Sequence, residues 1–109
     1  MKKPKIFIAC DTTNLAKVRE IINQSKTKKI KIGYKFGLEF MNSKKGRKFV
    51  STLRDKIIFV DLKLNDTVNT MLSAVKALKD LKINYLTVHI SSGLAALRAV
   101  KKVSGLTKI

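Results

Sequence analysis

The chain has 109 residues, enough for one small domain with a core of its own, and 45% of them are hydrophobic, which excludes an intrinsically disordered chain. No apolar stretch approaches the ~20 residues that a membrane-spanning helix needs, so we expect no membrane partner. The formal net charge of +17 comes from 24 basic and 7 acidic residues, a balance that can attract nucleic acid.

The first apolar run is Ile6–Cys10, which predicts a buried strand that Asp11 closes. This run is too short for the ~7–15-residue apolar region of a signal peptide, and a lone cysteine cannot form an internal disulfide, so we expect a cytoplasmic protein. Residues 12–14 are good helix N-caps. The helix after them is predicted to bury one face that carries Leu15, Val18, Ile21 and Ile22.

Two more strand–helix units follow. A strand is predicted over residues 30–36, and Asn42 and Ser43 are candidate caps of the next helix, which would carry Phe49, Val50 and Leu53. The third strand is predicted over residues 57–60. Asp66 or Thr67 opens the helix that follows, whose apolar face holds Val68, Met71, Leu72, Val75 and Leu78.

The fourth unit begins with a predicted strand over residues 85–88, which His89 follows. Its helix is expected to end near Gly105, a residue suited to a helix C-terminus, and residues 106–109 resemble the approach to a fifth strand. The apolar face of this helix carries Leu94, Leu97, Val100 and Val103.

The order βαβαβαβα with nearly continuous apolar strands predicts an α/β fold in which helices cover a parallel sheet. Each unit takes ~25–30 residues, close to the ~31 of a (β/α)8 TIM barrel, so we expect the first four βα units of such a barrel, a half-barrel. The alternative is a small doubly wound sheet. The first βα turn, residues 11–14, contains no glycine and so does not support the nucleotide-binding form of that fold.

Charged side chains follow the predicted strands at their carboxyl ends, which form the active-site face of a barrel. Asp61 and Lys63 lie two residues apart, so the alternation of strand side chains predicts that they point to the same side. Such a pair on a surface is often an ordinary ion pair worth ~0–1 kcal/mol. Several consecutive strands that end in charged residues favour a functional site at these strand ends. Its charged residues include Asp11, Lys35, Asp61, Lys63 and His89.

The segment from Asp61 to Thr70, DLKLNDTVNT, resembles the DLKxHDIPNT signature of orotidine 5′-phosphate decarboxylases. Three other segments are similar to that family in the same order: residues 7–11 (FIACD), residues 35–40 (KFGLEF) and residues 86–93 (LTVHISSG). The similarity extends over essentially all of residues 1–109, which we therefore expect to be a single partial domain, the N-terminal half of the barrel.

The resemblance implies conversion of orotidine 5′-phosphate to uridine 5′-phosphate and CO2, the last step of de novo pyrimidine synthesis, with no cofactor and no metal. Lys35, Asp61, Lys63 and Asp66 are expected to form an alternating charge array in which Lys63 protonates the pyrimidine. Asp11, Lys35 and Thr67 are expected to bind substrate. The resemblance also implies a homodimer in which Asp66 and Thr67 reach the neighbouring site, whereas His89 lies near the site with no assigned role.

Asn65, Thr67 and Val68 depart from the family signature, and the last two bear on the subunit contact rather than on the charges. The family holds the substrate's phosphate in the second half of the barrel, so we expect this chain alone to be inactive. A barrel similar to 3-hexulose-6-phosphate synthase, which needs magnesium, remains an alternative. So does a basic nucleic-acid-binding module, but the lysines are scattered and we expect no nucleic-acid partner. A purely structural half-barrel that awaits a partner chain is a further alternative.

Overall fold

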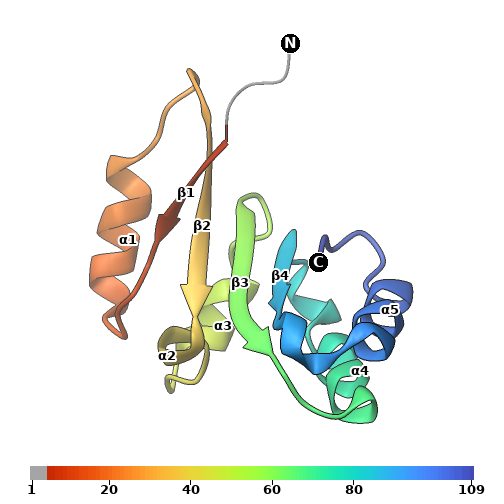
Figure 1. Ribbon diagram of the computed structural model, residues 1–109. Helices are drawn as coiled ribbons and strands as arrows, with labels where there is room; N and C mark the ends of the chain where they lie inside the picture. Colours follow the sequence, from red (N-terminus) through yellow and green to blue (C-terminus); the bar gives the residue numbers. More distant parts are fainter. Residues whose placement is uncertain (1–4) are drawn as a thin grey trace.

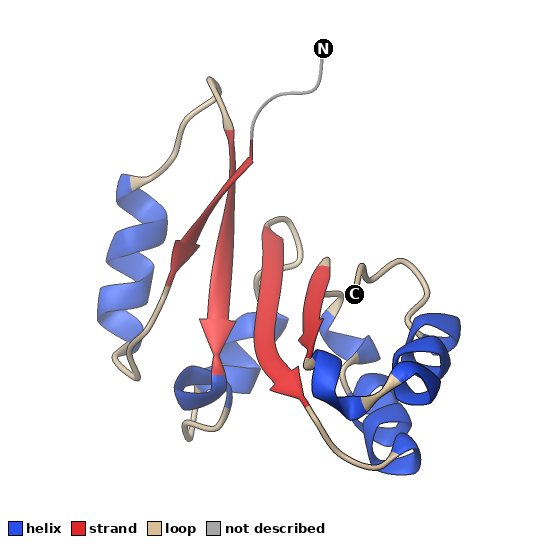
Figure 2. Cartoon of the chain, in the orientation of Figure 1, coloured by secondary structure: helices blue, strands red, loops and turns tan. Residues whose placement is uncertain are grey.

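A computed structural model describes residues 5–109, which form one four-stranded parallel sheet with helices between the strands (Figures 1 and 2). The strand order is β1-β2-β3-β4, the same as the order along the chain. The elements are β1 (Lys5–Ala9), α1 (Leu15–Gln24), β2 (Lys31–Gly37), α2 (Leu38–Met41), α3 (Gly46–Ser51), β3 (Ile57–Leu64), α4 (Val68–Ala77), the 3-10 turn η1 (Lys79–Leu81), β4 (Tyr85–Val88), η2 (Ile90–Ser92) and α5 (Leu94–Val103).

The sequential strand order distinguishes between the two folds that the sequence left open. A doubly wound sheet reverses its strand order at a switch point, and this sheet has no reversal among its four strands. Right-handed crossovers in one direction place successive helices on one face of the sheet. The four units therefore have the arrangement expected of successive βα units of a barrel.

The core lies between the sheet and the helices. Val18 and Ile22 are the buried residues of α1, as the predicted apolar face requires, and Cys10 at the end of β1 is fully buried. The rings of Phe36 and Phe40 lie 4.8 Å apart in the middle of this layer. The largest fully buried side chains are Phe36, Phe40, Ile58, Met71, Leu81, Val18, Val50, Val60, Val100 and Cys10.

A second set of aromatic rings lies side by side on three strands. Phe7 of β1 packs edge-on against Phe59 of β3 and Tyr85 of β4, with ring centroids 5.4 and 5.2 Å apart. All three residues are partly exposed. Phe59 precedes Asp61 by two residues in β3, so the aromatic cluster and the charged strand ends belong to the same side of the sheet.

The predicted second helix is wrong in its bounds. Residues 38–51 form two short helices, α2 and α3, and α3 begins after Lys45 without a side-chain cap. The hydroxyl of Ser43 instead donates to the carbonyl of Phe40 at 2.6 Å and helps to close the turn between them. A Cβ at buried Gly46 would overlap the Phe40 carbonyl oxygen, so this turn depends on a close backbone approach that only glycine allows.

The second half of the chain agrees more closely with the prediction. Thr67 caps α4 through its hydroxyl, which accepts from the backbone N–H of Thr70. Gly105 follows the end of α5 with φ 59°, the left-handed conformation that favours glycine there. Lys108 forms a parallel bridge to Tyr85, so the last residues do run beside β4. Within residues 5–109, no helix has the length and apolar character to cross a membrane.

Candidate active site

The carboxyl ends of β2 and β3 bring two lysines to one aspartate. Asp61 is only 8% exposed, and its Oδ2 atom lies 2.9 Å from Nζ of Lys63 and 3.4 Å from Nζ of Lys35. The parallel register pairs Lys35 with Phe59, two residues before Asp61, which places the Lys35 side chain within reach of the carboxylate. Three of the predicted site residues therefore form one cluster, here named the Lys35–Asp61–Lys63 cluster.

The other carboxylate oxygen of Asp61 is bound by a neutral group. The hydroxyl of Thr87 in β4 donates to Oδ1 at 2.7 Å, so both oxygens of Asp61 have partners. Thr87 was not among the predicted site residues. It lies beside Asp61 because Val60 pairs with Leu86, and Asp61 and Thr87 are the next residues on the two strands.

Opposing effects set the charge state of Asp61. Burial is the largest single effect and raises the pKa of the carboxyl group. The hydrogen bonds from Thr87 and Lys63, the charge of Lys63 and the hydrogen bond from Lys35 together outweigh it and hold the pKa below its ordinary value of 3.8. The cluster therefore presents an ionised carboxylate between two ammonium groups at neutral pH.

Lys63 reaches Asp61 by a different route from the one predicted. Plain strand alternation was expected to place both side chains on one side, but Lys63 has φ 49°, in the left-handed region. The pairing of β3 with β4 shifts register between Val60 and Leu64, so Lys63 lies in an irregular part of the strand. Its backbone N–H donates to the Thr87 hydroxyl oxygen at 2.9 Å. A lysine in this conformation is strained, and such strain concentrates at functional sites.

Asp11 borders the cluster from the end of β1. Gly37 pairs with Asp61 and lies close to Asp11 as well. A Cβ atom placed on Gly37 would be 4.0 Å from Oδ1 of Asp11 and 3.9 Å from the backbone oxygen of Asp61. The backbone N–H of Cys10 donates to the Lys35 carbonyl at 2.9 Å and fixes this end of β1 against β2. Asp11 is exposed, so its carboxylate is open to a ligand above the strand ends.

Asp66 and Thr67 lie at the start of α4, and both are exposed. Oδ1 of Asp66 accepts from the backbone N–H of Thr67 at 2.6 Å. Within the described part of the chain, no interaction joins Asp66 to the Lys35–Asp61–Lys63 cluster. The fourth member of the expected charge array therefore does not reach this cluster within a single copy of the chain.

His89 takes part in a local network that links β3 to η2. Its Nδ1 atom lies 2.6 Å from the Ser91 hydroxyl oxygen and accepts from the Ser91 backbone N–H at 3.1 Å. The side-chain amide of Asn65 donates to the same Ser91 hydroxyl at 2.9 Å. Asn65, which replaces the histidine of the family signature, thus ties the end of β3 to the turn after β4.

No group of three or more histidine, cysteine, aspartate or glutamate side chains among residues 5–109 is arranged to hold a metal ion. The cluster contains one carboxylate and two ammonium groups, and a protonated lysine has no lone pair to offer a cation. Its chemistry is that of fixed charge and of proton donation from nitrogen.

Comparison with known proteins identifies relatives along almost the entire chain. The model of the orotidine 5′-phosphate decarboxylase / HUMPS family matches residues 4–108. A protein of Oenococcus oeni named orotidine 5′-phosphate decarboxylase is 37% identical over 101 residues, which are 91% of this chain and 43% of that protein. A protein of the same name from Paramagnetospirillum magneticum is 38% identical over 96 residues, 86% of this chain and 40% of that protein.

The fold is similar to a solved structure as well. The crystal structure of orotidine 5′-phosphate decarboxylase from Lactobacillus acidophilus matches with a TM-score of 0.79 and 27% sequence identity, over 99% of this chain and 48% of that one. The expected fold class is thereby confirmed as part of a barrel of this kind. The chain spans less than half the length of each of these relatives.

Proposed function

This chain belongs to the orotidine 5′-phosphate decarboxylase / HUMPS family, and from that premise we propose that it carries the charged part of a site that decarboxylates orotidine 5′-phosphate. The observation that carries the proposal is the Lys35–Asp61–Lys63 cluster, where a nearly buried carboxylate holds two ammonium groups at the carboxyl ends of adjacent parallel strands. That end of a parallel barrel is where active sites form.

The reaction breaks the bond between C6 of the pyrimidine and its carboxylate. The bonding electrons stay on C6 as CO2 leaves, and a proton must then reach C6 to give uridine 5′-phosphate. With no cofactor to accept those electrons, fixed positive charge beside C6 lowers the energy of the transition state. Lys63 supplies both that charge and the proton, since an ammonium group can do both.

The other residues of the cluster hold this arrangement in place. Asp61 fixes Nζ of Lys63 at 2.9 Å and places negative charge next to the substrate carboxylate that must leave. Thr87 holds Asp61 from its other oxygen. Asp11 and Lys35, next along the strand ends, bind the ribose hydroxyls in this proposal.

Asp66 and Thr67 act in the neighbouring site of a homodimer in this proposal. Their exposure at the start of α4 and the lack of any link from Asp66 to the cluster in this part of the chain are what such an arrangement requires. The 3-hexulose-6-phosphate synthase alternative and the nucleic-acid module are not favoured, because the relatives reported above are named as decarboxylases. The cytoplasmic location stays a prediction.

The test replaces the matching 101-residue segment of the Oenococcus oeni relative with this chain. The chimera, first shown by thermal unfolding to be folded, is expected to release CO2 from orotidine 5′-phosphate. Lys63→Ala should reduce turnover by at least about 100-fold, since a positioned acid typically contributes ~10²–10⁴-fold. The matched control Lys101→Ala, on α5 and away from the strand ends, should leave turnover unchanged.

A folded chimera without activity, or one in which Lys63→Ala keeps full turnover, would contradict the proposal. The isolated 109-residue chain is expected to show little or no turnover. The resemblance places the phosphate site in the other half of the barrel, and binding energy from the phosphate is what such a site uses for catalysis.

A further inference from the structure

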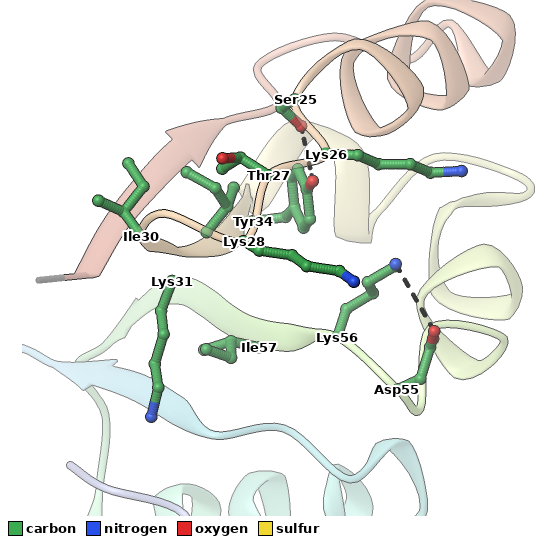
Figure 3. A pocket seen from close by; sticks show the side chains of 11 residues that line it. Ser25, Lys26, Thr27, Lys28, Ile30, Lys31, Tyr34, Asp55, Lys56 and Ile57 are labelled. Carbon is green, nitrogen blue, oxygen red and sulfur yellow. Dashed lines mark hydrogen bonds and ion pairs between the residues drawn. The ribbon is translucent and has the colours of Figure 1, made fainter. Parts of the chain in front are cut away.

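A cavity of about 850 Å³ (Figure 3) lies at the amino ends of β2 and β3, the opposite end of the sheet from the Lys35–Asp61–Lys63 cluster. Its walls are the loop between α1 and β2 and the first residues of β2 and β3, Lys31 and Ile57. The cluster sits at the other ends of the same strands. Ligand pockets commonly measure ~300–1,000 Å³, so the cavity has room for a small molecule.

The charge of this cavity is strongly one-sided. Four lysines line it, Lys26, Lys28, Lys31 and Lys56, against the single carboxylate of Asp55, and in Figure 3 the side chain of Lys31 extends away from the other three. Asp55 is exposed, and its Oδ2 lies 3.6 Å from Nζ of Lys56. In Figure 3 the side chains of Lys28 and Lys56 extend toward each other from opposite walls. Asp55 offsets part of the positive charge at Lys56, and the excess of lysines over carboxylates in the lining would attract an anion.

The remaining polar groups suit phosphoryl oxygens better than a base. Hydroxyl groups of Ser25 and Thr27 line the same loop, and Thr27 accepts from the backbone N–H of Lys29, which orders the loop. The one aromatic residue in the lining is Tyr34, which is 3% exposed and has its hydroxyl 2.6 Å from that of Ser25. No open ring is therefore offered for base stacking, which single-stranded nucleic acid sites use.

Positive potential continues beyond this cavity. Lys31 also lines a smaller cavity of about 160 Å³, together with Lys5 and Lys108. Tyr85 lies beside these lysines, and the hydrogen bond from Lys5 together with the charges of Lys5, Lys108 and Lys31 holds the pKa of its hydroxyl below the ordinary value, although burial opposes the effect. The amino ends of the strands thus form a basic end of the molecule.

We propose that the lysine-lined cavity at residues 25–31 and 55–57 binds a small polyphosphate, a ligand with two or more linked phosphoryl groups. Lysines at several places along the walls suit charge that is distributed along a chain of phosphates. Arginine is the usual choice for bidentate recognition of a nucleic-acid backbone, and none lines the cavity. The proposal does not depend on the decarboxylase function, which uses the other end of the strands.

The first experiment titrates inorganic triphosphate into the 109-residue chain at constant ionic strength and follows the backbone amide signals by NMR. The largest shifts are expected in residues 25–31 and 55–57, and triphosphate should bind at least about tenfold more tightly than monophosphate, because it engages more charge-assisted hydrogen bonds. Shifts centred on Lys35, Asp61 and Lys63, or spread evenly over all lysines, would overturn the proposal.

The second experiment compares two double variants with the same net charge. Lys26→Gln with Lys28→Gln should weaken triphosphate binding at least about tenfold, whereas Lys101→Gln with Lys102→Gln, at the end of α5, should leave it unchanged. Equal weakening by both pairs would show that only net charge matters and would refute the cavity. The proposal would also be refuted if single-stranded RNA bound more tightly than triphosphate and if its binding were unchanged by the Lys26→Gln and Lys28→Gln pair.

Nucleoside triphosphate in a parallel titration separates two sources of the same chemistry. Binding equal to that of inorganic triphosphate supports recognition of the phosphates alone, as the absence of an open ring in the lining suggests. Tighter binding of the nucleotide with shifts in the same residues supports the same site with contacts to the nucleoside as well. Failure of both ligands to bind would refute the site while leaving the decarboxylase proposal intact.

Discussion

Replacing Thr87 by valine removes the hydroxyl that holds Asp61 and keeps the β-branched shape of the side chain. The hydroxyl donates to Oδ1 of Asp61 at 2.7 Å and accepts from the backbone N–H of Lys63 at 2.9 Å. Hydrogen bonds to charged groups contribute ~1.5–3 kcal/mol, so Thr87→Val should lower the free energy of unfolding by about that amount at neutral pH.

The loss should depend on pH in a defined direction. The pKa of folded Asp61 lies below its ordinary value of 3.8, so the stability that ionised Asp61 contributes is present above that value and disappears as the pH falls through the folded pKa. Without Thr87, the pKa of Asp61 should rise. The difference between the parent chain and Thr87→Val should therefore hold steady near neutral pH and shrink as the pH falls toward and below 3.8.

Urea unfolding followed by far-ultraviolet circular dichroism is suited to this test because the chain contains no tryptophan. Carboxyl carbon signals in NMR report the pKa of Asp61 directly. Thr107→Val is the matched control, since the Thr107 hydroxyl donates to the Ile83 carbonyl at 2.9 Å and involves no ionisable group. If both variants lose the same free energy at every pH, the assignment of Thr87 as the anchor of Asp61 is wrong.

Three other predictions concern single positions. Burial, followed by the charge of Asp11, raises the pKa of the Cys10 thiol to about 11. The thiol should therefore react with Ellman's reagent only on unfolding, and fast reaction of the native chain would show that β1 is open. Gly46→Ala should lower the free energy of unfolding in urea by about 1–3 kcal/mol or more, because the new Cβ overlaps the Phe40 carbonyl, and a cost well under about 1 kcal/mol would mean that the turn adapts. Asn65→Ala should speed hydrogen exchange in residues 89–93 and leave α1 unchanged, whereas unaltered exchange there would show that the bond to Ser91 is not needed.

Three of the strands were predictable because each is a short apolar run that a polar residue closes, whereas β2 alternates apolar residues with Lys31 and Lys35. Tyr85–Val88 agrees residue for residue, and β1 and β2 are each shifted from the prediction by one residue at both ends. The third strand, β3, was predicted to end at Val60 and continues to Leu64, because Leu64 pairs with Val88 of β4 beyond the register shift. Apolar content marks the buried part of a strand and says little about where its pairing stops.

The helices between residues 38 and 51 could not be placed by periodicity. Their break depends on the contact between Gly46 and the Phe40 carbonyl, which is a consequence of packing rather than of local spacing. In the site, charge spacing identified Lys35, Asp61 and Lys63, which do come together. A neutral anchor such as Thr87 carries no such mark and appears only when β4 is placed beside β3.

The irregular register of β3 has a consequence for protein design. The Asp61–Lys63 pair has the spacing of any two residues on one side of a strand, which suggests that this short segment could be transplanted into an ideal sheet. In this molecule the pair relies on a left-handed lysine and on a threonine from the next strand that binds both the carboxylate and the lysine N–H. A transplanted site would therefore need both strands, the register shift between them and the threonine, because the sequence motif alone supplies only Asp61 and Lys63.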